Sequence, residues 1–460
     1  MRTIKFILLL LIAGYVAGSK APAQSAAGDT NAPGWITQPL SLLNCLNLAL
    51  SQNGTILKAK SDLQANYGIV IQTRAVALPQ LQATGQYKGS QRSAIEDIPP
   101  PFPELPNQNW NAGIQLVQSI YEGGKMLSAV RAARLIKEES LLEYQTVVDD
   151  TLLSTRLAYY DVLLAAQQIV VNKASVELLT KELEDQQRRY NAGTVPHFNV
   201  LRAEVAVANE RPALIQAQNN YRIAKNNLSN LLGYNLPRDI WEDIPLNLTD
   251  KLDDRPYQIE LPQAIEQALA NRTELAALRK GEALQRENVI AAKSGYKPTF
   301  QIFAGYTWYN TQFTPPIEIT HDLYGWNAGA QLSWDIFDGM LTRGKVMQAE
   351  ALHDKSKTEI EDKGRQIELE VRTAYSLFIE AQEVLDSQKT VQAEAEESLR
   401  EAQARAEAGT GTQLDVLDAQ TSLTQARTTE IQALHDYAAA RARLERAIGA
   451  DLTQAEGPKS

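Results

Sequence analysis

The sequence predicts an α+β membrane protein in which long strands and very long helices come from one duplicated unit. Two observations predict this fold class. The phrase WNAGIQL at residues 110–116 returns as WNAGAQL at residues 326–332. Around each copy, apolar and polar residues alternate, and a long proline-free stretch with helical periodicity then begins. We therefore expect two β-hairpins joined to long helices rather than a globular domain.

The duplication extends over most of the chain. The string AGTVPHFNVLRAEV, which begins at Ala192, aligns with AGTGTQLDVLDAQT, which begins at Ala408. We expect each repeat to contain a helix, a β-hairpin, a long helix and a return helix. The expected boundaries are a first repeat at 24–233, a linker at 234–260, a second repeat at 261–449 and a tail at 450–460.

The first 23 residues are typical of a secretory signal peptide. Arg2 and Lys5 precede the apolar stretch FILLLLIAGYVAG, and Ala21-Pro22-Ala23 has the small-residue pattern of a cleavage site. The apolar stretch is too short for a comfortable membrane-spanning helix, and no later segment approaches about 18 uncharged apolar residues. We therefore expect an exported chain that cannot enter a membrane as an apolar helix bundle.

Composition argues against several classes of function. The lone cysteine, Cys45, cannot form an internal disulfide or a zinc cluster, and we expect a packed helix residue there. The net charge of −10 argues against nucleic acid as a partner and suits a passage that prefers cations. The histidines are scattered and no hydrolase or metalloprotease motif occurs. We therefore predict no enzyme activity, no cofactor and no metal site.

Each repeat opens with a helical segment, expected at Ser41–Ala77 and Pro262–Ser294, and then changes to a period of two. The hairpins are expected at about 79–121 and 298–337. One face of the second hairpin carries the even-numbered residues from Tyr324 to Ile336, which are apolar or small.

Four of the six tryptophans lie in the hairpins, namely Trp110, Trp308, Trp326 and Trp334. Long alternating strands with aromatic residues toward their ends and a polar opposite face are typical of an outer-membrane β-barrel wall. A soluble sandwich with one wet face would alternate in the same way. The export signal and the aromatic residues favour the membrane.

The stretches Lys125–Tyr190 and Thr342–Ala406 contain no proline, and each is predicted to form one helix on the order of 100 Å long. Heptad-spaced apolar residues alternate with small residues and glutamines at many seam positions. This pattern predicts shallow seams in a wide tube of helices rather than a thick core.

The turns that follow the long helices have recognisable signals. Gly193 and Gly409 fit the left-handed residue that ends a helix. Asn199 and Asp415 lie near the start of the return helices, where short polar side chains cap.

Four strands per chain cannot stand alone in a bilayer, because open sheet edges would leave unsatisfied backbone groups in hydrocarbon. Two chains would give eight strands, whose interior is filled by side chains, whereas three would give twelve strands and a lumen. The polar inner faces suit a lumen. We therefore expect a homotrimer in outer-membrane lipid, with a twelve-stranded transmembrane β-barrel that a long α-helical barrel continues.

The sequence resembles the TolC family of outer-membrane efflux and secretion channels. The resemblance covers nearly all of the mature chain and rests on the duplicated element order, on RYNAGTVPHFNVLRAE and on AGTGTQLDVLDAQTSL. It implies a chain in the cell outer membrane with a periplasmic helical extension, and an equatorial belt formed by the linker around Trp241 and the tail. It also implies a periplasmic adaptor (membrane fusion) protein, and an inner-membrane pump of RND, ABC or MFS type. The implied function is the exit duct of a tripartite efflux pump or a type I secretion system.

Two sets of site residues follow from the resemblance. Asp415 and Asp418 match the family's paired acidic residues at the periplasmic constriction, where three chains would place a ring of carboxylates. From the residues alone, a helix cap and a first-turn acid explain both. The tip that adaptors grip is matched by Arg189, Tyr190, Gly193, Arg405 and Gly409. Ordinary helix termination applies to these residues as well.

The gate region departs from the family. The best-studied closed gate uses a Tyr and an Arg before the second return helix and an Asp at the start of the first. Here those positions are Ala406, Gly411 and Asn199. We expect that other contacts close the tip or that the resting state is less tightly shut.

The main alternative is a periplasmic coiled-coil structural or adaptor protein. An adaptor would pair one helical hairpin with a lipoyl-like sandwich, whereas this chain has two hairpins of each kind. An ordinary diffusion porin has no use for helices of this length.

Overall fold

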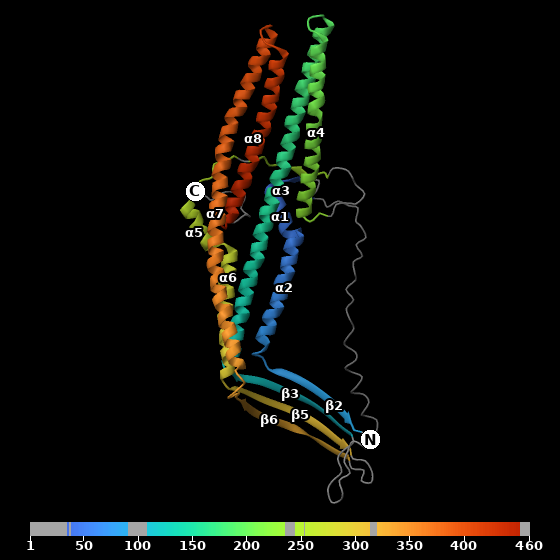
Figure 1. The fold of residues 1–460 in the computed structure, drawn as a ribbon. Helices are drawn as coiled ribbons and strands as arrows, with labels where there is room; N and C mark the ends of the chain where they lie inside the picture. The colour runs from blue at the N-terminus through green and yellow to red at the C-terminus, as the bar shows by residue number, and fades with distance from the viewer. Residues whose placement is uncertain are drawn as a thin grey trace, which may run out of the picture.

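A computed structural model of the chain describes Trp35 and residues 38–90, 108–234, 244–252, 254–312 and 320–450. The expected signal peptide at 1–23, Trp241 of the linker and the tail beyond residue 450 lie outside the described residues. Figure 1 shows two pairs of long helices that run side by side, with a single curved sheet at one end.

The described helices and strands occur in the same order in both halves. The first half contains α1 (Leu42–Gln52), α2 (Gly54–Ala75), β2 (Gln80–Gly89), β3 (Gln108–Glu122), α3 (Lys125–Asn191) and α4 (His197–Leu231). The second half contains α5 (Leu261–Asn271), α6 (Thr273–Lys293), β5 (Thr299–Gln312), β6 (Thr320–Ser333), α7 (Leu341–Glu407) and α8 (Gln413–Ala447). A short parallel pair, β1 (Pro39–Leu40) and β4 (Asn247–Leu248), joins the N-terminal segment to the linker.

The long helices match each other in length. α3 and α7 each contain 67 residues, and α4 and α8 each contain 35. At the rise of an α-helix, α3 and α7 are on the order of 100 Å long, as the sequence predicts. The described part of the chain is mostly helical, and it contains the long helices and the two β-hairpins that the sequence predicts.

The opening helix of each half is broken into two, which the sequence does not predict. Asn53 ends α1 with an extended backbone (φ −62°, ψ 128°), and its side-chain oxygen accepts from the N–H groups of Thr55 and Ile56. Asn53 therefore caps α2. Arg272 has nearly the same backbone conformation (φ −61°, ψ 119°) between α5 and α6.

Both breaks are tied to the end of a return helix. The Asn53 amide donates to the carbonyl of Leu231 at 2.7 Å, and the Arg272 guanidinium donates to the carbonyl of Ala447 at 3.3 Å. Gly233 and Gly449, both with positive φ, lie so close to residues 52 and 271–272 that a Cβ atom at either glycine would crowd them. In both halves, therefore, the residue at the helix break is bonded to the end of the return helix. This residue is the neutral Asn53 in the first half and the charged Arg272 in the second.

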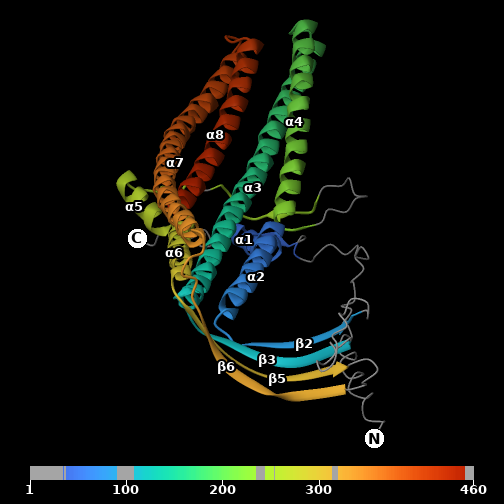
Figure 2. The same ribbon diagram turned by 60° about the horizontal axis from the view of Figure 1, so that its bottom comes forward.

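The four-stranded sheet has the order β2-β3-β5-β6, and all neighbouring strands are antiparallel. β3 and β5 come from different halves, yet their ladder runs from Glu122↔Thr299 to Gln108↔Gln312. Figure 2 shows the strands side by side in one curved layer below the helices. β2 and β6 are the edges, and neither has an outer partner among the described strands.

Aromatic side chains follow one face of the sheet. Trp110 contacts Trp308 edge to face at 5.5 Å between ring centroids, and Trp308 contacts Tyr324 at 6.4 Å. Trp326 is exposed on the same face of β6. A single chain therefore leaves an aromatic surface uncovered.

Trp334 and Ile336 lie beyond β6, which ends at Ser333, so the expectation that both belong to the strand is wrong. The Trp334 indole N–H donates to the carbonyl of Tyr296 at 3.2 Å, which ties the residue after β6 to the turn before β5. The apolar alternation of the sequence does not stop where the strand ends. Exposed aromatic side chains also occur in the connection from β6 to α7.

The helices form a layer whose order changes along its length. On the side away from the sheet, the order of packing is α4-α3-α8-α7, and toward the sheet it is α2-α3-α6-α7. α3 and α7 run through both levels. α4 and α2 form one lateral edge of the layer, and α7 forms the other, with α5 packed against α7 midway along it.

The largest buried clusters lie where short helices and the linker cover the long helices. One surrounds Tyr159 of α3 with residues of α1, α4 and the linker, and it includes the fully buried Cys45. The other surrounds Phe378 of α7 with residues of α5 and α8. Many buried positions are alanine, so the seams between the long helices are thin.

By length and composition alone, α3 contains a window apolar enough to cross a membrane. The same helix carries Arg156, whose side chain is buried in an ion pair with Glu445, and Tyr159, whose hydroxyl bonds to Asp250. The apolar residues of this stretch, Tyr159, Val162 and Leu163 among them, are buried in the cluster with α1, α4 and the linker, which accounts for its apolar character.

Candidate functional site at the helical tip

The two helical pairs turn at the same end of the molecule, opposite the sheet (Figure 1). Gly193 and Gly409 have φ values of +77° and +75°. The N–H of Thr194 donates to the carbonyl of Arg189 at 2.9 Å, and that of Thr410 donates to the carbonyl of Arg405 at 3.0 Å. Both long helices therefore end in the same glycine-based motif.

The return helices begin differently. In α8 the cap is Thr412: its hydroxyl accepts from the Asp415 N–H at 3.3 Å, and the Asp415 carboxylate accepts from the Thr412 N–H at 2.8 Å. The backbone and side-chain hydrogen bonds from Thr412 hold the pKa of Asp415 below its usual value. In α4 the cap position is Pro196, which has no side-chain donor or acceptor. Asn199 and Asp415 both lie in the first turn of their return helices, as expected. Asp415 takes part in the cap as its third-residue partner, whereas the start of α4 has no side-chain cap bond.

Asp415 and Asp418 lie one turn apart on α8, and both are exposed. Val416 and Leu417 are buried on the other side of the helix, against the rest of the chain. Neither carboxylate forms an ion pair with a described residue. Both therefore face away from the packed side of their own chain and are free to attract cations.

The residues expected to meet an adaptor surround the two turns. Arg189 pairs with Asp185 at 2.7 Å, and Arg405 pairs with Glu401 at 3.1 Å. The Tyr190 ring lies against His197, 5.1 Å between centroids. Gly193 and Gly409 have open space where a side chain would extend. These residues therefore form two small surfaces, one on each pair of helices.

A hollow of about 620 Å³ lies between the two tips. It brings together the three positions that depart from the family, Asn199, Ala406 and Gly411. The Gln413 side-chain amide donates to the carbonyl of Asn199 at 3.2 Å. A neutral hydrogen bond therefore joins the two tips across this hollow.

Gly411 leaves little space for a side chain. A Cβ atom there would lie 3.0 Å from the Ala406 nitrogen and 3.0 Å from the Arg405 Cβ. The Gly411 N–H also donates to the Arg405 carbonyl at 2.9 Å. The second turn is therefore folded onto the end of α7, and this close packing accounts for glycine at this position.

Three glutamines in the hollow were not singled out from the sequence. The side-chain oxygens of Gln186, Gln413 and Gln420 are buried without a hydrogen-bond partner among the described residues. Gln186 and Gln420 are 5% and 3% exposed. A buried amide oxygen without a donor is costly, so the hollow offers three acceptors to a ligand or partner that supplies donors. The sequence places glutamines at many seam positions, but nothing in it distinguishes these three oxygens as buried without a donor.

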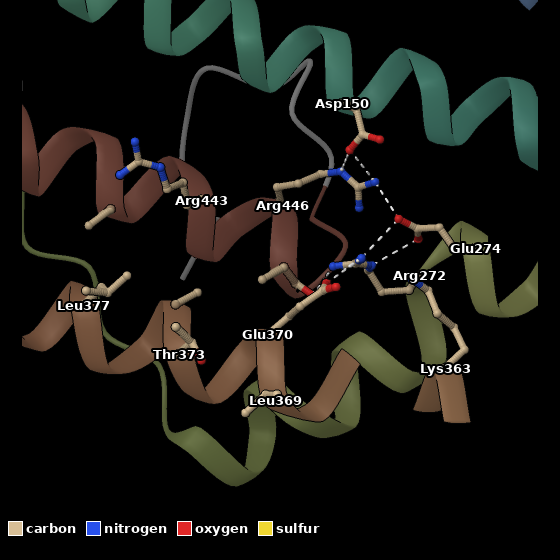
Figure 3. Close-up of a pocket in the computed structure, with 13 residues that line it drawn as sticks. Asp150, Arg272, Glu274, Lys363, Leu369, Glu370, Thr373, Leu377, Arg443 and Arg446 are labelled. Carbon is tan, nitrogen blue, oxygen red and sulfur yellow. Dashed lines mark hydrogen bonds and ion pairs between the residues drawn. The ribbon is translucent and has the colours of Figure 1, made fainter. Parts of the chain in front are cut away.

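A second hollow, of about 640 Å³, lies where α8 ends and α6 begins (Figure 3). Arg446 of α8 bonds to Asp150 of α3 at 2.8 Å and to Glu274 of α6 at 2.7 Å. Arg272 bonds to Glu274 at 3.0 Å and to Glu370 of α7 at 2.9 Å. The close-up shows the two guanidinium groups on either side of the Glu274 carboxylate.

Glu274 stays ionised in this cluster. Burial alone would raise its pKa, but its own backbone N–H and the guanidinium groups of Arg446 and Arg272 lower it to about 2. We name the cluster of Asp150, Arg272, Glu274, Glu370 and Arg446 the ionic joint. It connects α3, α6, α7 and α8 at one point and was not predicted from the sequence.

The family model described as "Outer membrane efflux protein" matches residues 45–234 and 264–450 of the chain. Outer membrane protein TolC of Escherichia coli (strain K12) is 25% identical over 429 residues, which cover 90% of this chain and 83% of that protein. Cobalt-zinc-cadmium resistance protein CzcC of Cupriavidus metallidurans is 24% identical over 451 residues, 96% of this chain and 99% of that protein.

A solved structure has the same fold. The outer membrane channel CmeC of Campylobacter jejuni superposes with a TM-score of 0.74 at 16% sequence identity. The match covers 89% of this chain and 85% of that one.

Proposed function

This chain belongs to the outer membrane efflux protein family, and we propose that three copies of it close into one continuous tube. The protein is an outer-membrane exit duct of an efflux or type I secretion system, with a periplasmic extension. It works with an adaptor and an inner-membrane pump. The trimer proposal depends on one observation: the sheet and the helical layer are open on both lateral sides.

The open sheet supports closure with other copies. Among the described strands, the outer edges of β2 and β6 each present an unpaired row of backbone N–H and C=O groups, which cannot be left in hydrocarbon. The β6 edge of one chain would pair with the β2 edge of the next. Three chains with four strands each would close a twelve-stranded barrel wide enough for a lumen.

The helical layer supports the same arrangement. α4 carries an exposed apolar row on the side away from α3, at heptad spacing: Phe198, Leu201, Val205 and Ile215. The helix at the opposite edge of the layer is α7. We infer that the row on α4 packs against α7 of the next chain, below the closed barrel.

We propose that Asp415 and Asp418 from three chains form an acidic ring at the constriction. Both side chains are exposed on the same face of α8 and lack an ion pair among the residues described at the tip. Carboxylates around a narrow passage favour cations and bind multivalent ones.

The gate itself would be held by neutral contacts. The bond from Gln413 to Asn199 takes the place of the family's charge-assisted contacts, and we propose that the resting tip is less tightly shut. Single-channel recording of the wild type tests this, and a well-closed baseline would count against it.

The hollow between the tips supports docking of the periplasmic adaptor. Arg189 lines it on one helical pair, next to Tyr190 in the chain, and Ala406 and Gly411 line it on the other, next to Arg405 and close to Gly409 in the chain. The unpartnered glutamine oxygens between them would accept hydrogen bonds from adaptor side chains that donate.

The pump would be of RND, ABC or MFS type. One relative is named for cobalt, zinc and cadmium resistance and another for alkaline protease secretion. We infer that the pump, not the duct, selects the cargo.

We also propose that residues 1–23 are removed on export, and that the linker at 234–260 and the tail at 450–460 form a belt around the tube. The repeats at 24–233 and 261–449 would then contribute alternate segments of the wall. The internal duplication would give the trimer near-sixfold symmetry.

The test is the mass and shape of the protein, purified from native outer membranes in mild detergent. Light scattering should give a three-chain particle, and negative-stain images should show a long hollow cylinder. A monomer, or a solid rod released without detergent, would overturn the tube and favour a periplasmic coiled-coil spacer.

A further inference from the structure

A pocket of about 320 Å³ lies beside the start of α1, between α3, α8 and the linker. Four basic side chains line it, those of Arg156, Lys251, Arg255 and Arg441, together with one acidic side chain, Asp250. The chain as a whole has a net charge of −10. A basic excess at one enclosed place in an acidic protein produces a local positive potential.

The one acidic residue that lines the pocket is already engaged. The Asp250 carboxylate accepts from the N–H of Leu42 at 2.7 Å and from the hydroxyl of Tyr159 at 3.1 Å. It thereby closes the N-terminus of α1 and fastens the linker to α3. No ion pair joins Asp250 to a basic side chain in the described residues.

The two arginines on the helices share a single carboxylate behind the pocket. Arg156 Nη1 donates to Glu445 at 2.5 Å, and Arg441 Nε donates to the other Glu445 oxygen at 2.9 Å. Arg156 Nη2, both Nη atoms of Arg441 and Lys251 Nζ have no hydrogen bond to any residue that the structure describes. Charged donors therefore remain available at the pocket.

We propose that this pocket binds a phosphate-type oxyanion. Guanidinium groups hold tetrahedral oxyanions through paired N–H donors, and an ammonium group adds a point charge. Arg156 and Arg441 are held in place by Glu445, so their free donors are fixed before a ligand arrives. Lys251 is exposed at the mouth. A bound anion would connect the linker to α3 and α8.

The test is calorimetric titration of inorganic phosphate into the full-length protein in detergent, at constant ionic strength. We expect saturable binding with one site per chain. Lys251→Gln should weaken the affinity about tenfold, because one charge-assisted contact is lost. Lys345→Gln, which removes an exposed charge from α7, should leave the affinity unchanged. Lys251 has no side-chain hydrogen bond or ion pair with a residue that the structure describes, and equal melting temperatures would verify that Lys251→Gln leaves the fold intact.

Three outcomes would overturn the proposal. They are no saturable heat at millimolar phosphate, equal affinity in Lys251→Gln, and loss of affinity in Lys345→Gln. If an acidic side chain of a second copy of the chain occupied the pocket, phosphate would give no saturable heat. The readout does not depend on transport, so its failure would leave the exit-duct function intact.

Competition identifies the source of the anion. Displacement of phosphate by glycerol 3-phosphate but not by phosphatidylglycerol vesicles would indicate a soluble ligand. Displacement by the vesicles but not by glycerol 3-phosphate would indicate a lipid headgroup. Either result supports an oxyanion site.

Discussion

A single charged residue, Arg446, connects three helices of this protein through ion pairs. The side chain of Arg446 is only 8% exposed, and two carboxylates from α3 and α6 surround it. Removing one partner of a buried ion pair leaves the other charge without compensation, and this costs more than the pair itself contributes.

Arg446→Met should therefore destabilise the protein by about 3 kcal/mol, because Glu274 would be left half-neutralised beside Arg272. Guanidinium unfolding in detergent measures the free energy. Arg443→Met, on the exposed side of the same turn, should change it by less than about 0.5 kcal/mol. Equal effects of the two substitutions would show that the ionic joint is not a local stabiliser.

His435 makes the contact between α8 and α3 sensitive to pH. Its Nε2 lies 2.8 Å from Asp161 of α3, and its Nδ1 lies 3.0 Å from Asp436. Burial lowers the pKa of His435, but the hydrogen bonds and charges of Asp161 and Asp436 outweigh it and raise the pKa above 6.5. A raised pKa in the folded state means that the contact stabilises fully below pH 6.5 and is lost as pH rises through the folded-state value.

His435→Gln should accordingly lower the melting temperature most at acid pH, and its difference from the wild type should shrink toward alkaline pH. Thermal scans between about pH 5 and 9 measure this. His197→Gln, at the tip and without a carboxylate partner among the described residues, serves as the control. A constant difference across the range would contradict the role of protonation.

Sequence patterns located the tip residues but not their contacts. Asp415 could be placed in the first turn of α8 from its spacing, whereas the cap, Thr412, is decided by which hydroxyl reaches the free N–H groups. The glutamine oxygens could not be foreseen, because burial without a partner depends on the packing of α3 against α8. The ionic joint was missed for the same reason, since its residues lie far apart along the chain.

At the scale of helices and strands, periodicity predicted most of the fold. α3, α7 and the hairpins have strong repeating patterns, and the structure contains them. The breaks at Asn53 and Arg272 have weaker signals, because only tertiary contacts with the return helices decide them. The end of β6 was misjudged because aromatic residues continue into the connection.

The contact between the two tips gives a prediction about opening. Gln413→Ala removes the hydrogen bond to the Asn199 carbonyl, and we expect an increase of about fivefold in the open fraction. Single-channel recording in planar bilayers measures it. Gln187→Ala, which removes an exposed amide from α3, is the matched control and should leave the recording unchanged. No change in Gln413→Ala would mean that other contacts hold the tip.

At the scale of the whole molecule, the exposed apolar row on α4 either faces solvent or forms an interface with a second copy of the chain. Val205 is 58% exposed in one chain. If it packs against a second copy, Val205→Lys should shift the protein from trimer to monomer in light scattering, because a buried charge without a partner is costly. Val170→Lys, at an equally exposed valine of α3 (60%), should leave the mass unchanged. A trimer in both variants would remove α4 from the interface.

The proposed acidic ring would likewise exist only in an assembled trimer. Asp415→Asn combined with Asp418→Asn should reduce cation selectivity and weaken block by divalent ions at least tenfold, because both depend on carboxylates around one passage. Reversal potentials and block titrations measure these effects. Asp415→Glu with Asp418→Glu keeps the charge and should retain both properties. Unchanged block in the asparagine variant would place the constriction elsewhere.

The contact between the helix break and the end of the return helix recurs in both halves, and it has a mechanical consequence. Where Asn53 meets Leu231 the fastening is one neutral hydrogen bond, and where Arg272 meets Ala447 it is reinforced by four further charged groups. Around a ring of three chains, compliant and stiff joints would alternate. A tube that is almost sixfold in outline would then flex with threefold symmetry, and each dilation would begin at the three compliant joints.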